Sequence, residues 1–452
     1  MAKAVKFKGG RHVRAGNMLS TPELIREAAQ FSRLEKLLPR WRRVPLYHKT
    51  LAHTGNGRLV SLQTDFFRLP LITKREMRNA FPQNFLRPGQ NLEILLEQKQ
   101  VELEYTSGTS EERLPVLFGR GWWNQQEQIV LRTNRLVARV LDEHPGARRA
   151  TLVPPVCNGI ACFSHLHSRA ERAVGTTLYV NRSRIPFLLE DAELARMAAE
   201  VSEWSPQFLD LDPVHGAWFA LYCERQGLRF PSLKFILCSY EFVSVVHRRI
   251  LQRVFRVPVF NLYGSTETGH LLMESEAGEM KPGLETAFLE NVEPDECGVG
   301  HLVVTTLTND YMPLVRYRIG DLVERQEQPY ATNYWVHGRS RDALHRADGR
   351  RVTTLEVDRC FAGVGGIAHY LLRQSADGDC RLQFVPDGDG PTAQELNEAV
   401  TRLETLIRPA HSIGTEAVKL LPPTLSGKFQ LTCPGLVSVW VAEELNSTVH
   451  PA

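Results

Sequence analysis

The sequence predicts an α/β fold: a large N-terminal domain with mostly parallel sheets flanked by helices, plus a small α+β C-terminal domain. The chain has 452 residues, which is too long for one ordinary hydrophobic core. Short apolar strands alternate with helical patterns over most of its length. From Trp335 onward the segments become short charged strands with Gly/Asp-rich turns. We therefore place a boundary near Gly338, between domains of residues 1–338 and 339–452.

The first expected element is a helix over residues 21–38. Thr21 can cap it, Pro22 suits its first position, and Pro39 marks its end. The clearest expected strands are Ala150–Val153, Lys234–Leu237, Val257–Leu262 and His301–Thr306. Helices are expected at Asp191–Trp204, Val214–Arg225 and, in the C-terminal part, Gln394–Ile407. This alternation favours largely parallel strands with helices packed around them.

Composition excludes several classes of partner. The formal net charge of +3 is too small to argue for nucleic acid or an anionic membrane as the main partner. No apolar run approaches the roughly 18 residues that span a bilayer. The eight cysteines form no Cys-x-x-Cys pair, so neither a disulfide framework nor a structural zinc is expected. A cytoplasmic protein with reduced thiols and small-molecule partners fits best, and a homodimer stays open.

The segment from Tyr105 to Ser110 is the most informative one. It reads Tyr-Thr-Ser-Gly-Thr-Ser after a strand-like alternation, so its backbone N–H groups and hydroxyls can face phosphate oxygens. Such a turn alone is more often a plain loop. It also lacks the lysine of the P-loop motif.

Two further segments carry residues suited to a nucleotide. Asn261 to Glu267 follows a strand: Tyr263 offers a ring for a base, Thr266 a hydroxyl for a phosphate, and Glu267 a hard oxygen ligand for Mg²⁺. Arg316 to Asp321 ends a strand with a carboxylate, which could accept hydrogen bonds from both ribose hydroxyls. In isolation Asp321 is equally well a turn residue.

The last two segments lie in the C-terminal part. Gly338-Arg339-Ser340-Arg341-Asp342 coincides with the compositional boundary, and Pro423-Thr424-Leu425-Ser426-Gly427-Lys428 forms a glycine turn near the end. A lone lysine is usually a solvated surface residue. The order and spacing of all five segments give Lys428 its weight.

Together, the five segments resemble the superfamily of acyl-CoA synthetases, peptide-synthetase adenylation domains and luciferases. The resemblance runs from about Tyr105 to Lys428. Val44-Pro45-Leu46-Tyr47 and the segment from Leu69 to Arg78 further resemble the opening of the phenylacetate-CoA ligase branch. That branch is compact and acts mainly on aryl or arylacetic acids, so the resemblance implies an adenylate-forming, AMP-producing acid ligase.

The resemblance also implies roles for individual residues. The β- and γ-phosphates of ATP would be held by Thr106, Ser107, Gly108, Thr109 and Ser110. Adenosine would be bound by Tyr263 with Gly264, by Asp321 and by Arg339, whereas Ser239, Tyr240 and Glu241 would border the adenylate. Thr266 would contact the α-phosphate, Glu267 would bind Mg²⁺, and Lys428 would contact the carboxylate and α-phosphate. Arg341 falls near the hinge about which, by this resemblance, the small C-terminal domain would be mobile. The acyl pocket would be lined by Pro154, Asn158, Gly159 and Phe163.

Two departures from the family pattern keep alternatives open. Glu111 and Glu112 follow the phosphate loop where the family usually has Gly-Lys-Pro, and the cysteine and histidine common after Glu267 are missing apart from His270. The leading hypothesis is aryl-acid activation with ATP followed by thioester formation with CoA. The alternative is an adenylating enzyme whose acceptor is a carrier-protein thiol, an amine or a hydroxyl. A third hypothesis is a degenerate homologue that binds a nucleotide or acyl-adenylate without turnover.

Overall fold

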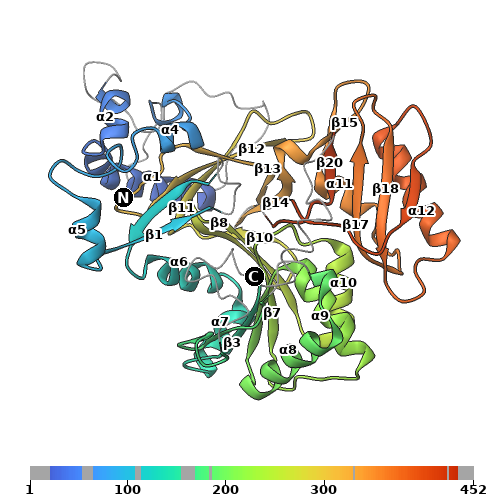
Figure 1. Ribbon diagram of the computed structural model, residues 1–452. Helices are drawn as coiled ribbons and strands as arrows, with labels where there is room; N and C mark the ends of the chain where they lie inside the picture. Colours follow the sequence, from blue (N-terminus) through green and yellow to red (C-terminus); the bar gives the residue numbers. More distant parts are fainter. Residues whose placement is uncertain are drawn as a thin grey trace.

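A computed structural model describes residues 21–52, 65–106, 113–153, 168–182, 186–328, 331–424 and 427–435. One large sheet dominates it (Figure 1). Its strands are β3 (Arg149–Leu152), β4 (Ala173–Val174), β5 (Thr177–Tyr179), β6 (Phe208–Leu211), β7 (Phe235–Cys238), β8 (Val259–Ser265), β9 (Gly269–Glu274), β10 (Met280–Pro282), β11 (Ala287–Val292), β12 (Val299–Thr306), β13 (Tyr317–Gln328) and β14 (Ala331–Arg339). Their spatial order is β11-β12-β13-β14-β10-β9-β8-β7-β6-β3-β5-β4.

The predicted α/β class is confirmed, but the expectation of mostly parallel pairing holds for only part of the sheet. Strands β5, β3, β6, β7 and β8 pair parallel with one another, in that order. The other strands pair antiparallel, including β8 with β9 and β13 with β14. Short connections explain this difference, because a turn of three residues between β8 and β9 can only reverse the chain.

Helices cover both faces of the parallel strands. The covering helices are α6 (Trp122–Leu131), α7 (Arg135–Glu143), α8 (Asp191–Trp204), α9 (Pro213–Arg225) and α10 (Val245–Phe255). On β6, Leu209 and Leu211 pack with α8, α9 and α10, whereas Phe208 packs with α6 and α7. Alternate residues of a strand point to opposite faces, so Asp210 lies on the α6 side.

The N-terminal region packs against the antiparallel half of the large sheet. Its elements are α1 (Thr21–Trp41), α2 (Pro45–Ala52), η1 (Phe66–Arg68), α4 (Lys74–Arg78), α5 (Leu92–Glu97) and the hairpin of β1 (Val101–Tyr105) with β2 (Pro115–Gly119). Helix α1 continues through Pro39 to Trp41, which corrects the expected end. A proline in the last turn removes only one helical hydrogen bond, and Trp41 is buried in the core.

A second, four-stranded sheet follows β14. Its strands β17 (Ile367–Gln374), β18 (Cys380–Pro386), β19 (Gly414–Ala417) and β20 (Thr432–Pro434) are accompanied by η3 (Ser340–Asp342), β15 (Leu344–His345), β16 (Arg351–Val352), α11 (Thr354–Arg359) and α12 (Ala393–Ile407). The remaining short helix is η2 (Pro186–Leu188). The small sheet shares a hydrophobic cluster with α9 and α10. The domain boundary near Gly338 stays a prediction.

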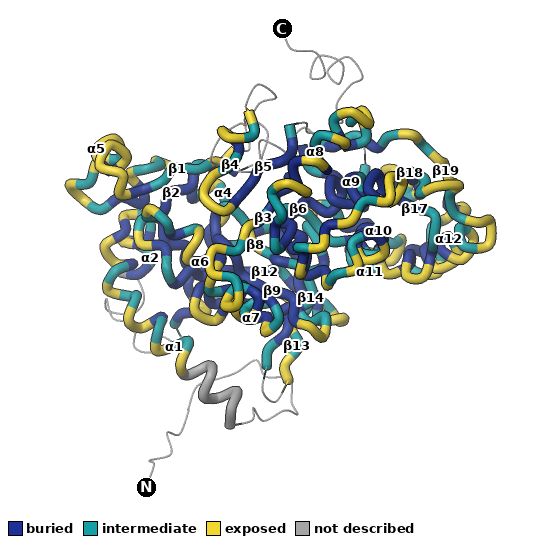
Figure 2. The backbone as a smooth tube through the Cα atoms, turned by 90° about the horizontal axis from the view of Figure 1, so that it is seen from below, coloured by how far each residue is buried: buried dark blue, intermediate teal, exposed yellow. Residues whose placement is uncertain are grey.

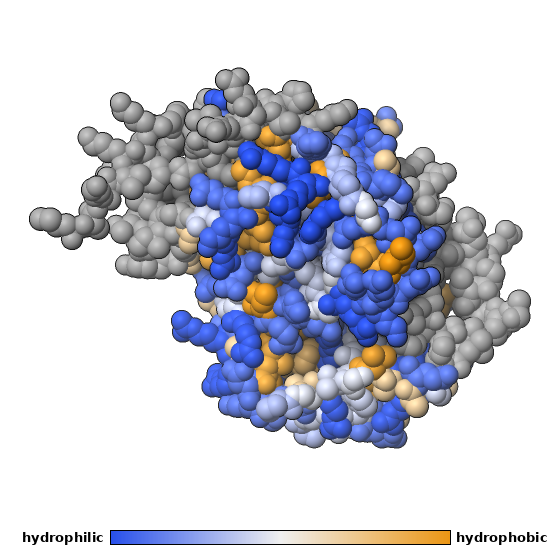
Figure 3. Space-filling model, turned by 90° about the vertical axis from the view of Figure 1, so that its left-hand side faces the viewer, coloured by the Kyte–Doolittle hydropathy of each residue, from blue (hydrophilic) through white to orange (hydrophobic). Residues whose placement is uncertain are grey.

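Burial follows these layers. Strands β3, β6, β9 and β12 are largely buried, whereas α5 and α12 present exposed residues (Figure 2). Figure 3 shows a side of the molecule that is mainly hydrophilic, with apolar atoms in small separate patches. Within the described ranges, no helix combines the length and apolarity that crossing a bilayer requires.

Candidate active site

The turn after β8 places Glu267 at the carboxyl edge of the parallel strands. Gly264 is required there, because a Cβ at this position would lie 2.4 Å from the carbonyl oxygen of Gly269. The side chain of Glu267 is only 5% exposed. Lys74 Nζ lies 3.4 Å from its Oε1, and the Tyr317 hydroxyl donates a hydrogen bond to the same atom at 3.1 Å.

These contacts keep Glu267 ionised despite its burial. Burial acts to raise the pKa of Glu267, but the Lys74 ammonium and hydrogen bonds from its own backbone N–H and from Ser265 outweigh it and leave the pKa below its ordinary value. A buried carboxylate that stays charged is a suitable ligand for a hard cation. Among the described residues, no group of three or more His, Cys, Asp or Glu side chains could hold a metal by itself. A Mg²⁺ ion here would therefore need ligand oxygens from a bound phosphate as well.

Lys74 is held by the way its segment joins the sheet. Ile72 pairs with Tyr317 as a parallel bridge, and its backbone bonds reach Arg316 and Arg318 at 3.0 and 2.9 Å. Helix α4 then begins with a capping box, in which the Thr73 N–H donates to Glu76 Oε2 at 2.8 Å. The N-terminal region thus contributes a cation to the turn after β8.

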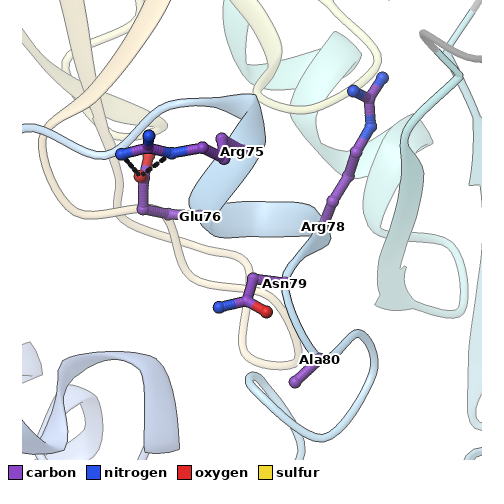
Figure 4. A pocket seen from close by; sticks show the side chains of 5 residues that line it. All are labelled: Arg75, Glu76, Arg78, Asn79 and Ala80. Atoms are coloured by element: carbon purple, nitrogen blue, oxygen red, sulfur yellow. Dashed lines mark hydrogen bonds and ion pairs between the residues drawn. The ribbon is translucent and has the colours of Figure 1, made fainter.

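The same helix borders a hollow of about 690 Å³, lined by Arg75, Glu76, Arg78, Asn79 and Ala80. Figure 4 shows Arg75 bonded to Glu76, while Arg78 points away from both. The Nε and Nη2 atoms of Arg78 are buried, and neither has a hydrogen-bond partner among the residues that the structure describes. Arg78 lies four residues after Lys74, so the two cations lie on the same side of α4.

A second group of polar residues surrounds Asp321. Residues Asp321 and Arg339 pair across β13 and β14, and Arg339 Nε lies 3.0 Å from Asp321 Oδ1. The Tyr263 hydroxyl donates to Asp321 Oδ2 at 2.5 Å. The Asp321 carboxylate raises the pKa of Arg339, while burial and the same carboxylate raise that of Tyr263. Both partners therefore keep their protons at neutral pH.

Lys428 reaches the loop after β7 from the C-terminal part. Its Nζ donates to the carbonyl oxygen of Tyr240 at 3.0 Å, and the Phe429 N–H donates to Glu241 Oε1 at 2.8 Å. Tyr240 has a left-handed φ of 73°, which is uncommon for a residue with a side chain. Burial and the neighbouring Asp212 raise the pKa of Glu241, whereas Lys428 opposes the shift.

These groups share one edge of the sheet. Strands β7 and β8 are parallel neighbours, with Cys238 opposite Asn261, so Ser239 to Glu241 and Tyr263 to Glu267 emerge from the same end. The carboxyl edge of parallel strands is where α/β proteins bind ligands. The structure therefore gathers residues from three regions of the sequence at a single edge.

The other predicted site residues have mixed positions. Thr106 is buried and accepts a hydrogen bond from the Leu114 N–H at 3.0 Å, which closes the base of the predicted phosphate loop. Thr266 is partly buried in the turn beside Glu267, and Arg341 is largely exposed in η3. The remaining predicted residues lie outside the described part: Ser107, Gly108, Thr109, Ser110, Pro154, Asn158, Gly159 and Phe163.

Sequence reasoning did not assign Lys74, Tyr317 or Arg78 to the site. Lys74 and Arg78 stand within the segment that carried the branch resemblance, and the Thr73 to Glu76 spacing is a recognisable capping box. That signal locates a helix start, but not the neighbour that the helix will face. Tyr317 reads as an ordinary buried strand residue, so no local signal marks its hydroxyl.

Curated relatives align with parts of the chain. The phenylacetate-coenzyme A ligases of Pseudomonas putida and Thermus thermophilus are 25% and 26% identical, over 67% and 65% of this chain. Protein CapK of Staphylococcus aureus is 27% identical over 27% of the chain. The alignments span 67%, 64% and 28% of these relatives, respectively. No protein-family model matches the chain.

Solved structures share the fold. The 2-hydroxyisobutyryl-CoA ligase in its postadenylation state superposes with a TM-score of 0.68 at 17% identity, covering 98% of each chain. The same ligase in its thioesterification state gives 0.53 at 18% identity, covering 95% of this chain and 93% of the other. The anthranilate CoA ligase AuaEII with anthranoyl-AMP gives 0.52 at 14% identity, covering 72% of this chain and 65% of the other. The predicted resemblance to the phenylacetate-CoA ligase branch and the fold of adenylate-forming ligases are confirmed.

Proposed function

We propose that this protein activates a carboxylic acid with ATP as an acyl-adenylate and then transfers the acyl group to CoA. One observation carries the proposal: Glu267, Asp321 and Lys428, from three distant segments, converge on the carboxyl edge of the parallel strands. The relatives and neighbours named as CoA ligases support the same activity.

Each group has a chemical task in the first half-reaction. Attack of a carboxylate on the α-phosphorus brings two anions together, so catalysis depends on positioning and on cations around the reacting atoms. Lys428 would supply one such cation, and Glu267 would hold Mg²⁺, which would neutralise phosphate charge. Lys74 and Arg78, on the same side of α4, suit the triphosphate because both carry positive charge. Within the described part of the chain, Arg78 Nε and Nη2 also have no hydrogen-bond partner.

Asp321 would hold the ribose of ATP. Tyr263 and Arg339 each take one of its two oxygens, and a carboxylate offers about four acceptor positions. Two positions therefore remain, one for each ribose hydroxyl. The ring of Tyr263 would lie beside adenine, and Thr266 beside the α-phosphate.

The second half-reaction would require Lys428 to leave. The chain beyond Arg339 would turn about the segment containing Arg341, which is exposed and therefore able to change conformation. That one neighbouring ligase has been solved in postadenylation and thioesterification states supports such a motion. The domains themselves, residues 1–338 and 339–452, are part of this proposal.

The test is pyrophosphate release from ATP over a panel of benzoates, hydroxybenzoates, aminobenzoates and arylacetates, with and without CoA. We expect release with at least one acid, and consumption of free CoA in the same reaction. Adenylate formation without CoA consumption would instead support a carrier-protein thiol, an amine or a hydroxyl as acceptor. No pyrophosphate with any acid, together with measurable ATP binding, would support a nucleotide-binding protein without turnover.

A further inference from the structure

A row of polar side chains crosses the parallel strands on the α6 side of the sheet. Tyr179 of β5 pairs with Thr151 of β3, which pairs with Asp210 of β6. Residues paired directly across neighbouring strands point to the same face. Asp210 lies on the α6 side, so Thr151 and Tyr179 do as well. Apolar residues occupy the next positions, Leu237 and Phe260.

This row carries an excess of buried negative charge. Arg149 Nη1 lies 2.6 Å from Glu127 Oε1 and 3.7 Å from Asp210 Oδ2, so one guanidinium serves two carboxylates. Burial raises the pKa of Asp210 to about 6, which still leaves it mainly ionised at neutral pH. Burial lowers the pKa of His270, so that ring is neutral and adds no balancing charge.

Two polar atoms of this group lack hydrogen-bond partners among the described residues. Thr151 is 2% exposed, and its Oγ1 has no hydrogen bond in the described part of the chain. The Nε2 atom of His270, which is 9% exposed, is likewise without one. Asp210 Oδ1 accepts from Ser239, and its Oδ2 is paired with Arg149 at 3.7 Å, which is longer than a hydrogen bond. Buried polar groups in native proteins are nearly always satisfied, so these two atoms are suited to hydrogen-bond a polar group of a ligand.

The row begins beside the proposed reaction centre. Ser239 Oγ donates to Asp210 Oδ1 at 2.7 Å, and the next residue, Tyr240, accepts the hydrogen bond from Lys428. A carboxylic acid whose carboxylate meets Lys428 would therefore extend its other end along the sheet towards Asp210 and Thr151. Arg149 and Glu127 alone already join the sheet to α6, so that structural task does not require Asp210 or Thr151.

We propose that Asp210, Thr151 and Ser239 form a polar subsite for a hydrogen-bond donor on the acid, so that the substrate is a hydroxy- or amino-substituted carboxylic acid. This inference rests on the proposed function and deepens it. An ionised carboxylate only accepts hydrogen bonds, so Asp210 selects a donor. The excess negative charge disfavours a second acidic group on the substrate and favours a neutral hydroxyl or an amine.

The experiment compares matched acids in the pyrophosphate-release assay. Benzoate is paired with hydroxybenzoates and aminobenzoates, and isobutyrate with 2-hydroxyisobutyrate and 2-aminoisobutyrate. In the unmodified protein, we expect at least one substituted acid to exceed its parent in kcat/KM by about 10-fold or more, because a parent acid leaves buried groups unpaired. The hydroxyl and amino arms show which donor the subsite takes.

Two variants then test the assignment. Asp210→Asn keeps the shape of the side chain and can still accept from Ser239, and Thr151→Val is nearly isosteric. We expect each to lower kcat/KM for the preferred substituted acid by about 10- to 100-fold and for the parent acid by less than about 3-fold. Asp142→Asn, on the exposed side of α7, is the matched control and should change neither. Thermal unfolding of each variant identifies any loss of folding.

The outcomes distinguish failure of the polar subsite from failure of the proposed adenylation activity. Equal kcat/KM for parent and substituted acids, or an equal loss for both in folded Asp210→Asn and Thr151→Val, contradicts the subsite while leaving the adenylation proposal standing. Absence of pyrophosphate with every acid contradicts the adenylation proposal, and with it the subsite.

Discussion

The substitution Asp321→Ala gives the most direct test of the nucleotide site. Asp321 is 5% exposed, and its two oxygens accept from Tyr263 and Arg339, which leaves about two acceptor positions for the ribose. A hydrogen bond to an ionised group contributes about 1.5 kcal/mol or more, so loss of both would weaken ATP binding by about 3 kcal/mol. That free energy corresponds to an increase of about 150-fold in Kd.

Isothermal titration of ATP into the two proteins measures this change directly. Removal of Asp321 also leaves Arg339 without its carboxylate, so thermal unfolding must show that the variant is folded at the titration temperature. Asp310→Ala is the control. Asp310 is exposed and paired with Arg40 rather than with Tyr263 or Arg339, so its removal should leave the Kd for ATP unchanged. An ATP Kd within about 3-fold of the unmodified protein, in a folded variant, would remove Asp321 from the site.

Three further predictions concern the other charged groups. We expect Lys428→Ala to abolish pyrophosphate release while the Kd for ATP changes by less than about 3-fold, because the lysine acts on the reacting groups. Lys419→Ala, at an exposed position, is the control. Unaltered pyrophosphate release in Lys428→Ala would refute the role. Glu267→Gln should raise the Mg²⁺ concentration for half-maximal release by about 10-fold, as one ionised ligand is lost, and an unchanged requirement would argue against metal binding. Burial raises the pKa of Asp358 from 3.8 to about 6, so between pH 3.8 and 6 the folded state binds more protons than the unfolded state. The free energy of unfolding therefore falls as pH rises through that window, by about 3 kcal/mol in total. Urea unfolding from pH 4 to 7 should show a smaller fall in Asp358→Asn, and parallel curves would contradict the assignment.

The sequence predicted the helices more accurately than the sheet. The segment Asp191–Trp204 has the bounds of α8, and the helix expected from Val214 begins one residue earlier, at Pro213. Helix α8 has apolar residues at helical spacing, and α9 begins at a capping aspartate, Asp212, followed by Pro213, so local residues determine both. The direction of strand pairing is not local. It depends on how the chain returns, which is why the antiparallel half of the sheet was not expected.

The site shows the same division between local and distant information. Glu267, Asp321 and Lys428 could be selected because each stands in a recognisable segment. Lys74 and Tyr317, which contact Glu267, could not be selected in this way. They are brought to Glu267 by a bridge between Ile72 and Tyr317, which lie over 240 residues apart in the sequence. The polar row of Thr151 and Asp210 was also missed, since each residue alone reads as part of a buried strand.

The contacts that hold Lys428 in place bear on how it could leave. Asp358 accepts hydrogen bonds from Ser244 at 2.5 Å and from Tyr370 at 2.8 Å, and so ties α11 and β17 to the start of α10. The stacked rings of His247 and His369, with nitrogens 3.0 Å apart, lie in the same interface.

Rotation of the C-terminal part would expose these buried groups to water. Exposure removes the burial that raises the pKa of Asp358 from 3.8 to about 6, so between these pH values its proton would be released as the interface opens. Burial and the neighbouring His247 also hold the pKa of His369 well below its ordinary value, and exposure would let that ring bind a proton instead. The opposite signs mean that the two groups partly cancel in the proton balance of the motion. The rotation would therefore depend on pH less than either group alone suggests, which suits a motion repeated in every catalytic cycle.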